Sequence, residues 1–133
     1  MDDDVAVGRL YKKILSRSEG GGFTVELASG GKEALARISA AYDCMILDLR
    51  LPDISGFEVL RQVRARPELR DLPVIIVTAS EDEADGVRAL EMGANDYINK
   101  PIKTVNLFFA IVKKHIARAE ELKLKRAGYS VGG

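Results

Sequence analysis

The segment at residues 44–52 limits the possible folds of this 133-residue chain more than any other stretch. It opens with four apolar residues, Cys-Met-Ile-Leu, without polar alternation, which is typical of a strand buried on both faces in a parallel sheet. Asp48 follows this run directly, and Pro52 and Gly56 then break the extended chain before a helix. We therefore expect Asp48 at the carboxyl end of a central strand, the edge where ligands bind in open α/β sheets.

The charge balance argues against some classes of partner. The 20 basic and 20 acidic residues cancel, so net charge does not favour nucleic acid or a membrane surface as a direct partner. No apolar run approaches the roughly 18 residues of a membrane span, and no signal peptide opens the sequence. Cys44 lies in an apolar run, where we expect it to pack as a small hydrophobic residue. These features predict a cytoplasmic protein.

A helix is predicted near the N-terminus. Val7, Leu10, Tyr11, Ile14 and Leu15 recur at helical spacing and form one apolar stripe. The acidic residues at 2–4 precede this stripe, as capping residues at a helix N-terminus do, and the glycines at 20–22 end it.

Strands and helices alternate along the rest of the chain. Residues 23–27 predict a strand near the sheet edge, 73–79 a second buried strand and 96–99 a short one. Helices are predicted at about 31–41, 56–65 and 82–92, and from about 104 to 125. This order predicts an α/β fold, a doubly wound parallel sheet with helices on both faces. Residues 1–126 are expected to form one domain, and the Gly-rich residues 127–133 a flexible C-terminal tail.

Polar side chains follow three of the predicted strands. Asp48, Thr78 and Lys100 each close a strand, and right-handed crossovers place these ends at the same edge of the sheet. Asp2 and Asp3 begin the first helix, whose N-terminus faces that edge too. Three neighbouring carboxylates repel one another unless a cation neutralises them, and such oxygen ligands suit Mg²⁺. With a lysine and a hydroxyl beside them, they suit a phosphoryl group that a carboxylate, Asp48, accepts as nucleophile.

These residues resemble the receiver domain of two-component response regulators, a flavodoxin-like fold with strand order 2-1-3-4-5. The resemblance covers Asp2 to about Arg118. It implies that Asp2 and Asp3 are the family's acid pair, that Asp48 is its phospho-acceptor and that the backbone carbonyl of Arg50 is its third metal ligand. It also implies that Thr78 is the family's hydroxyl residue, Lys100-Pro101 its lysine-proline pair and Tyr97 its aromatic switch residue.

The resemblance also implies a mechanism. A partner histidine kinase offers phosphohistidine, Asp48 takes the phosphoryl group with Mg²⁺, and the bond later hydrolyses. Thr78 then moves toward the phosphoryl oxygens and Tyr97 rotates inward, which changes the face formed by the fourth helix, fifth strand and fifth helix of the family. Such a protein carries a phosphoryl group on itself and is not an enzyme acting on a free substrate. Arg50 is expected either to cover the phosphoryl group or to be a solvated surface residue.

The N-terminus departs from the family pattern. Members begin with an apolar strand of about five residues before the acid pair, whereas only Met1 precedes Asp2 here. Loss of an inner strand would leave unpaired backbone groups on both sides of a slot in the sheet. We weigh three explanations: a shortened N-terminus, a strand supplied by another copy or a swapped segment, and direct pairing of the second strand with the third. Weaker Mg²⁺ binding than in a full receiver domain is expected.

Two other classes of function stay open. A phosphatase of the haloacid dehalogenase type also uses a strand-end Asp, a Thr and a Lys, but it requires an acid two residues after the nucleophile, where Arg50 stands. It also requires an acid pair after the lysine, which is absent. The second alternative is a receiver-like interaction module that takes no phosphate.

Two features of the last helix have simple interpretations. His115 lies on its inner stripe and is expected to be a packed core histidine rather than a ligand. The mixed charges at 113–126 are expected to form a solvated helix face. The alternatives for this segment are a linker to an output domain and a homodimer contact.

Overall fold

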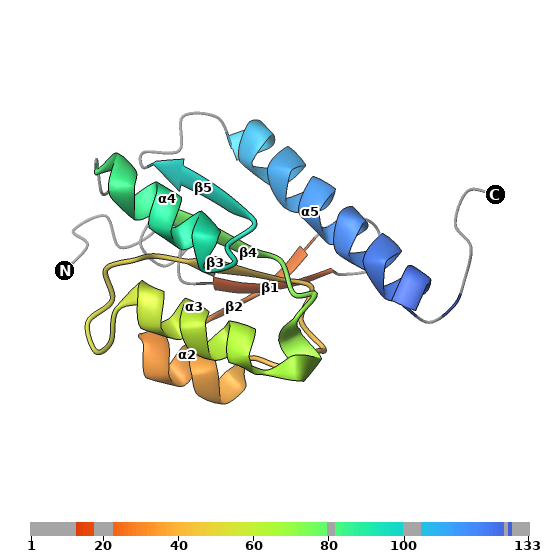
Figure 1. Ribbon diagram of the computed structural model, residues 1–133, viewed down its shortest axis with the longest axis horizontal. Coiled ribbons are helices and arrows are strands. Elements are labelled where there is room, and N and C mark those ends of the chain that lie inside the picture. The colour runs from red at the N-terminus through yellow and green to blue at the C-terminus, as the bar shows by residue number, and fades with distance from the viewer. Residues whose placement is uncertain (1–12, 18–22, 80–81, 100–104, 127, 129–133) are drawn as a thin grey trace.

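A computed structural model describes residues 13–17, 23–79, 82–99, 105–126 and 128. Their strands form one five-stranded sheet of order β2-β1-β3-β4-β5 (Figure 1). The strands are β1 (Lys13–Arg17), β2 (Phe23–Leu27), β3 (Cys44–Leu47), β4 (Val74–Thr78) and β5 (Asp96–Asn99). β3, β4 and β5 are parallel, as the apolar runs predict, whereas β1 is antiparallel to both of its neighbours, β2 and β3.

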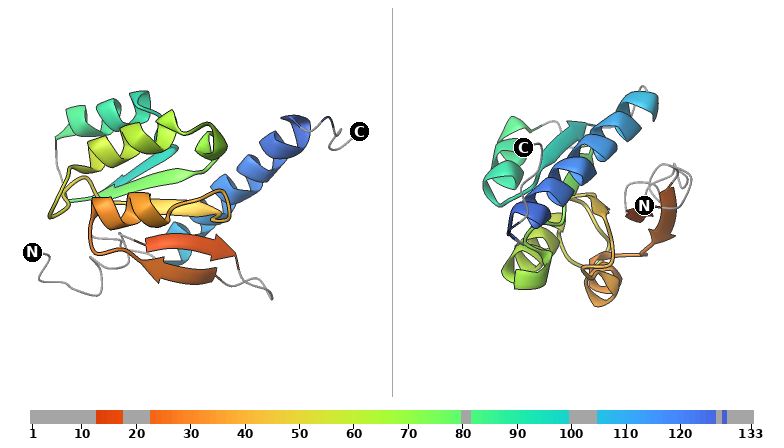
Figure 2. Two further views of the ribbon diagram at one scale, coloured as in Figure 1. Left: turned by 90° about the horizontal axis from the view of Figure 1, so that it is seen from below. Right: turned by 90° about the vertical axis from the view of Figure 1, so that its right-hand side faces the viewer.

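The helices cover both faces of the sheet. They are α2 (Gly31–Arg37), α3 (Gly56–Ala65), the short 3₁₀ helix η2 (Pro67–Leu69), α4 (Glu83–Glu91) and α5 (Val105–Arg126). α2, α3 and α4 lie on one face and α5 crosses the other, with its last turns extending past the sheet (Figures 1 and 2). The α/β fold with helices on both faces is therefore confirmed. No helix in the described part of the chain is long and apolar enough to span a membrane.

The alternation of side chains along β3 and β4 divides the core into two layers. Met45 and Leu47 point to the α3 side, where they join Val59, Leu60 and Val63. On the α5 side, a second cluster joins Cys44, Ile46, Ile75 and Val77 to Phe108, Val112 and Ile116. Every residue of β3 and β4 is buried, because helices cover both faces of these strands. Burial raises the pKa of the Cys44 thiol to about 12, so this residue packs as an inert hydrophobic group.

The predicted N-terminal helix is wrong for Ile14 and Leu15, which lie in β1. β1 occupies the slot that the family's first strand would fill, so the filling segment comes from this chain itself. It pairs over five residues with β2, and Ile14 and Leu15 also pair with Met45 and Cys44 of β3. The backbone groups that β1 satisfies on two strands explain why pairing overrides the helical pattern here. Residues 7–12 of the apolar stripe lie outside the described residues.

Local capping explains where two helices begin. The Ser55 hydroxyl accepts a hydrogen bond from the Glu58 N–H at the start of α3, and the Asp82 carboxylate accepts one from the Ala84 N–H at the start of α4. α3 has the predicted bounds. α2 ends at Arg37 rather than near residue 41, because Ile38 adopts an extended conformation.

Candidate functional site

Asp48 directly follows β3 and is buried, with 6% of its surface exposed. The backbone N–H of Arg50 donates a 3.0 Å hydrogen bond to its Oδ1 atom. This bond fixes the carboxylate relative to the turn that follows the strand. A carboxylate placed in this way at the carboxyl end of an inner strand stands where open α/β sheets bind their ligands.

The turn after Asp48 requires glycine at position 56. A Cβ atom at Gly56 would lie 2.2 Å from the Asp48 carbonyl oxygen and 2.6 Å from the Leu49 Cα atom. The Gly56 N–H donates a 2.9 Å hydrogen bond to the Leu49 carbonyl oxygen. The start of α3 is therefore packed directly against the end of β3, which holds residues 49–55 as a closed loop beside the carboxylate. We call residues 49–55 the acceptor loop.

The strand register brings Thr78 to the same edge as Asp48. Leu47 pairs with Ile76, so Asp48 lies beside the next residue of β4, and Thr78 is the last residue of that strand. Thr78 is fully buried and pairs in turn with Asn99, the last residue of β5. Lys100 follows Asn99 directly in the sequence but lies outside the described residues, as do Asp2 and Asp3. Two of the predicted site residues, Asp48 and Thr78, thus share one edge of the sheet.

Tyr97 lies in β5 and is half-buried against the α3-side core. Its ring rests on α4: a Cβ atom at Gly86 would lie 3.3 Å from two carbons of the ring. A second contact joins α4 to α3, since the Arg88 guanidinium lies 4.2 Å from the centre of the Phe57 ring. The sequence did not reveal the contacts of Gly86 and Arg88, because these depend on how α4 packs and not on any local pattern.

Asp53 is a further residue that the sequence did not single out. It lies in the acceptor loop, yet its carboxylate accepts hydrogen bonds from the Gly31 and Lys32 N–H groups at the start of α2, at 2.8 and 2.9 Å. These backbone donors, that of Lys32 first, lower the pKa of Asp53 to about 2. No sequence signal could have found this cap, because it lies more than 20 residues from the helix it caps.

The oxygen atoms of Asp48 and Arg50 are of the kind that binds a hard cation. The Asp48 carboxylate and the backbone carbonyl of Arg50 are oxygen donors, which Mg²⁺ prefers. In the part of the chain that the structure describes, no group of three or more His, Cys, Asp or Glu residues could hold a metal ion. Asp2 and Asp3, which the sequence predicts as further ligands, lie outside the described residues.

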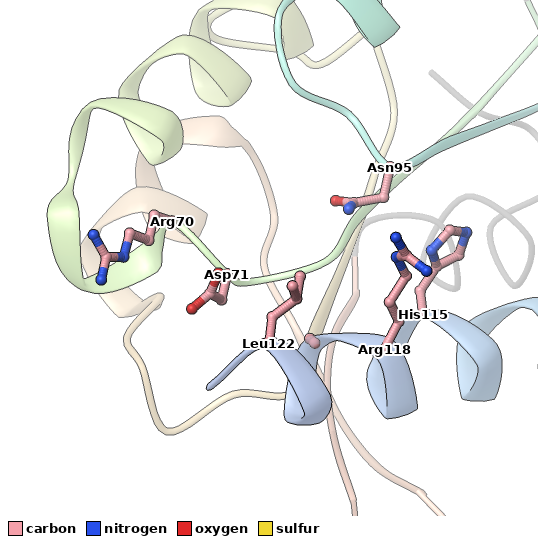
Figure 3. A pocket seen from close by; sticks show the side chains of 7 residues that line it. Arg70, Asp71, Asn95, His115, Arg118 and Leu122 are labelled. Carbon is pink, nitrogen blue, oxygen red and sulfur yellow. The ribbon is translucent and has the colours of Figure 1, made fainter. Parts of the chain in front are cut away.

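A small pocket of about 70 Å³ lies between α5 and the residues that precede β4 and β5 (Figure 3). It is lined by Arg70, Asp71, Asn95, His115, Arg118, Ala119 and Leu122. His115 Nε2 lies 3.0 Å from Oδ2 of Asp96, the first residue of β5. His115 is thus a half-buried packing residue with a carboxylate partner. Its partner Asp96 lies at the amino-terminal end of β5, whereas Asp48 lies at the carboxyl end of β3.

Comparisons with known proteins agree with the fold. The family model of the response regulator receiver domain matches residues 1–112. The transcriptional regulatory protein GltR of Pseudomonas aeruginosa is 40% identical over 123 residues, which are 90% of this chain and 48% of that protein. The chain spans about half the length of the curated relatives it matches.

Solved structures of receiver domains are also similar. A CheY-like response regulator receiver domain protein from Methanospirillum hungatei has a TM-score of 0.63 at 29% identity, over 72% of this chain and 75% of that one. The receiver domain of a sensor histidine kinase from Pseudomonas aeruginosa has a TM-score of 0.59 at 33% identity, over 69% of this chain and 75% of that one. In that structure a magnesium ion is coordinated in the active site cleft.

Proposed function

The chain belongs to the response regulator receiver domain family, and we propose that it is a switch of a two-component system with Asp48 as phospho-acceptor. One observation carries this proposal: Asp48 is buried at the carboxyl end of β3, at the same edge as Thr78, with its Oδ1 atom held by the Arg50 N–H. A carboxylate oriented in this way at the end of an inner strand can act as the nucleophile that attacks phosphorus.

The transfer step uses the chain's own groups. A partner histidine kinase presents phosphohistidine, an oxygen of Asp48 forms a bond to phosphorus, and the phosphorus–nitrogen bond breaks, with its electron pair returning to the imidazole. The Thr78 hydroxyl donates a hydrogen bond to a phosphoryl oxygen, and the Lys100 ammonium pairs with another. In the later hydrolysis step, water attacks phosphorus, the bond between phosphorus and the Asp48 oxygen breaks, and inorganic phosphate leaves. The protein is its own substrate and does not turn over a free phosphoester.

We assign the Mg²⁺ ligands to Asp2, Asp3, Asp48 and the backbone carbonyl of Arg50. Bound Mg²⁺ would neutralise the negative charge that the carboxylates and the phosphoryl oxygens bring together. The hard oxygen donors at Asp48 and Arg50, and the magnesium ion in the cleft of a similar receiver domain, support this assignment.

The response of the protein follows from the neighbours of the site. Thr78 ends β4 and Tyr97 lies one strand further along the sheet, with its ring on Gly86 of α4. A displacement of Thr78 toward the phosphoryl group would change the packing available to Tyr97 and thereby the position of α4. The switch is then a shift between two packings of the α4-β5-α5 face.

The partners follow from the family and from the length of the relatives. We propose a sensor histidine kinase or phosphotransfer protein as donor, in the cytoplasm. The match covers 48% of the transcriptional regulatory protein GltR. We therefore propose that an effector segment responds to the phosphorylation of this domain. The domain is proposed to comprise residues 1–126, with 127–133 as a tail.

The test is phosphorylation by a small donor. The protein is incubated with acetyl phosphate, with Mg²⁺ or with a chelator, and its intact mass is measured over time, with Asp48→Asn as control. We expect one phosphoryl adduct on the parent protein, only with Mg²⁺, and none on the variant. No adduct on a folded parent would favour an interaction module, and steady release of phosphate from an unrelated phosphoester would favour a phosphatase.

A further inference from the structure

We propose that Asp53 is a positioning residue that clamps the acceptor loop against α2 and thereby sets the Mg²⁺ affinity of the site. The inference rests on the proposed function, because it concerns the same carboxylate and metal. Asp53 does not touch the reacting atoms in this account. It acts by holding the short segment that carries Arg50.

The clamp is made of three hydrogen bonds from two parts of the chain. Asp53 Oδ1 accepts from the Gly31 N–H at 2.8 Å and from the Ile54 N–H at 2.8 Å, and Oδ2 accepts from the Lys32 N–H at 2.9 Å. Both carboxylate oxygens are therefore used. The bonds to Gly31 and Lys32 join the loop after β3 to the start of α2, so the loop cannot shift without breaking them.

The backbone at the start of α2 is shaped to receive this carboxylate. A Cβ atom at Gly30 would lie 2.8 Å from Asp53 Oδ1, closer than Cβ atoms come in real proteins, and 3.0 Å from Oδ2. A Cβ atom at Gly31 would lie 2.6 Å from Val59 Cγ2 and 2.7 Å from Ile54 Cγ1. Two consecutive glycines thus let the loop and the helix approach each other at the one place where the carboxylate enters.

The clamp lies in the middle of a loop whose two ends are already fixed near Asp48. At one end the Arg50 N–H binds Asp48 Oδ1, and at the other the Gly56 N–H binds the Leu49 carbonyl oxygen. Asp53 lies between these points and gives the loop its attachment to α2. Since the proposed third metal ligand is the carbonyl of Arg50, a loop held in place presents that oxygen ready for Mg²⁺. Residues that orient metal ligands in this way commonly change metal affinity by about 10- to 100-fold when removed.

The experiment compares Asp53→Asn and Asp53→Ala with the parent protein. Mg²⁺ affinity is measured by titration calorimetry, and adduct formation from acetyl phosphate is measured at limiting and at saturating Mg²⁺. We expect Asp53→Ala to weaken Mg²⁺ binding by about tenfold, with a smaller effect for Asp53→Asn, which keeps one oxygen acceptor. The rate at limiting Mg²⁺ should fall in parallel, and the rate at saturating Mg²⁺ should recover. Unchanged Mg²⁺ affinity in a folded variant would overturn the inference.

Two further variants separate positioning from stability. Glu33→Gln is the control, because Glu33 lies in the first turn of α2 and the hydrogen bonds that the structure gives it come from Ser29 and Arg37, not from the acceptor loop. It should leave Mg²⁺ affinity unchanged. Gly30→Ala displaces the Asp53 carboxylate without removing it, and it should weaken Mg²⁺ binding in the same direction, which tests the clamp if Asp53→Ala does not fold.

The outcomes also separate this inference from the proposed function. If the parent protein takes no phosphoryl group on Asp48, the proposed function is wrong. Amide hydrogen exchange at residues 49–55 then still decides the clamp, since faster exchange in Asp53→Asn supports it and unchanged exchange contradicts it. If the parent is phosphorylated and Asp53→Ala matches it at every Mg²⁺ concentration, the proposed function stands and the clamp does not.

Discussion

The ring of Tyr97 lies against Gly86 of α4, and a Cβ atom at position 86 would come within 3.3 Å of the Cδ1 and Cε1 atoms of the ring. This contact joins the strand that neighbours Thr78 to the helix whose position would report phosphorylation. Glycine weakens a helix interior, so its presence in the middle of α4 calls for a reason. The space taken by the aromatic ring supplies that reason.

Gly86→Ala is therefore predicted to behave differently with and without the ring. In a helix interior, alanine is more favourable than glycine by about 1 kcal/mol. In the parent background the added methyl group crowds Tyr97, so we expect no gain in the free energy of unfolding. In a Tyr97→Ala background the full gain of about 1 kcal/mol should appear. Urea unfolding of the four proteins measures this, and an equal gain in both backgrounds would show that the contact does not matter.

Arg64 is predicted to be a major anchor of α3. Its guanidinium donates to the carbonyl oxygens of Gly93 and Leu69 at 2.9 and 3.1 Å, and to Asn95 Oδ1 at 2.8 Å. Burial lowers its pKa, yet three acceptors hold the cation in place. Arg64→Ala should lower the free energy of unfolding by about 2 kcal/mol, because three acceptors lose a charged donor.

Arg61 gives the matched control for that variant. It lies on the same helix, is exposed, and pairs only with the neighbouring Glu58 among the contacts the structure gives it. Arg61→Ala should therefore cost less than about 1 kcal/mol, as exposed ion pairs do. Similar losses for the two variants in urea unfolding would contradict the anchoring role of Arg64.

The strand at Lys13–Arg17 gives a prediction for NMR spectroscopy. Because Ile14 pairs with Glu26 and Met45, its ¹³Cα chemical shift and that of Leu15 should have the sign typical of strands. Contacts between protons of Ile14 and Met45 should also be observed across the antiparallel pair. Helix-type shifts at both residues would instead mean that the apolar stripe at 7–15 prevails over strand pairing.

The pH dependence of stability should report Asp53. Its pKa is lowered to about 2 by the backbone donors of Lys32 and Gly31, so the folded state binds a proton less readily than the unfolded chain. The stabilisation is then complete above the ordinary aspartate pKa of about 4 and is lost as the pH falls through about 2. The difference in urea unfolding midpoint between the parent and Asp53→Asn should be constant near neutral pH and should shrink as the pH falls from about 4 to about 2. A difference that grows on acidification would contradict the assigned hydrogen bonds.

The sequence predicted the parts of the fold that have local causes. The apolar runs that became β3 and β4, with Asp48 and Thr78 at their ends, are visible because strands covered on both faces need apolar residues throughout. α3 begins at Gly56, where the break in the extended chain at Pro52 and Gly56 predicts a helix. In these segments, local preference and tertiary packing favour the same structure.

The sequence could not predict the features that depend on distant partners. Ile14 and Leu15 have helical spacing, and only the unpaired edges of β2 and β3 make them a strand. The bonds of Asp53 to Gly31 and Lys32 cross two elements, and the glycines themselves look like ordinary turn residues. Gly86 likewise acquires its meaning only when Tyr97 is placed beside it.

The central claim is that Asp48 carries the phosphoryl group, and the most direct measurement locates that group chemically. After phosphorylation by acetyl phosphate with Mg²⁺, borohydride reduces an aspartyl phosphate to homoserine, which peptide mass spectrometry assigns to a position. The account predicts homoserine at position 48 and at no other aspartate, and none without the donor. Homoserine at another aspartate, or its absence at position 48 in a protein that has gained a phosphoryl group, would contradict it.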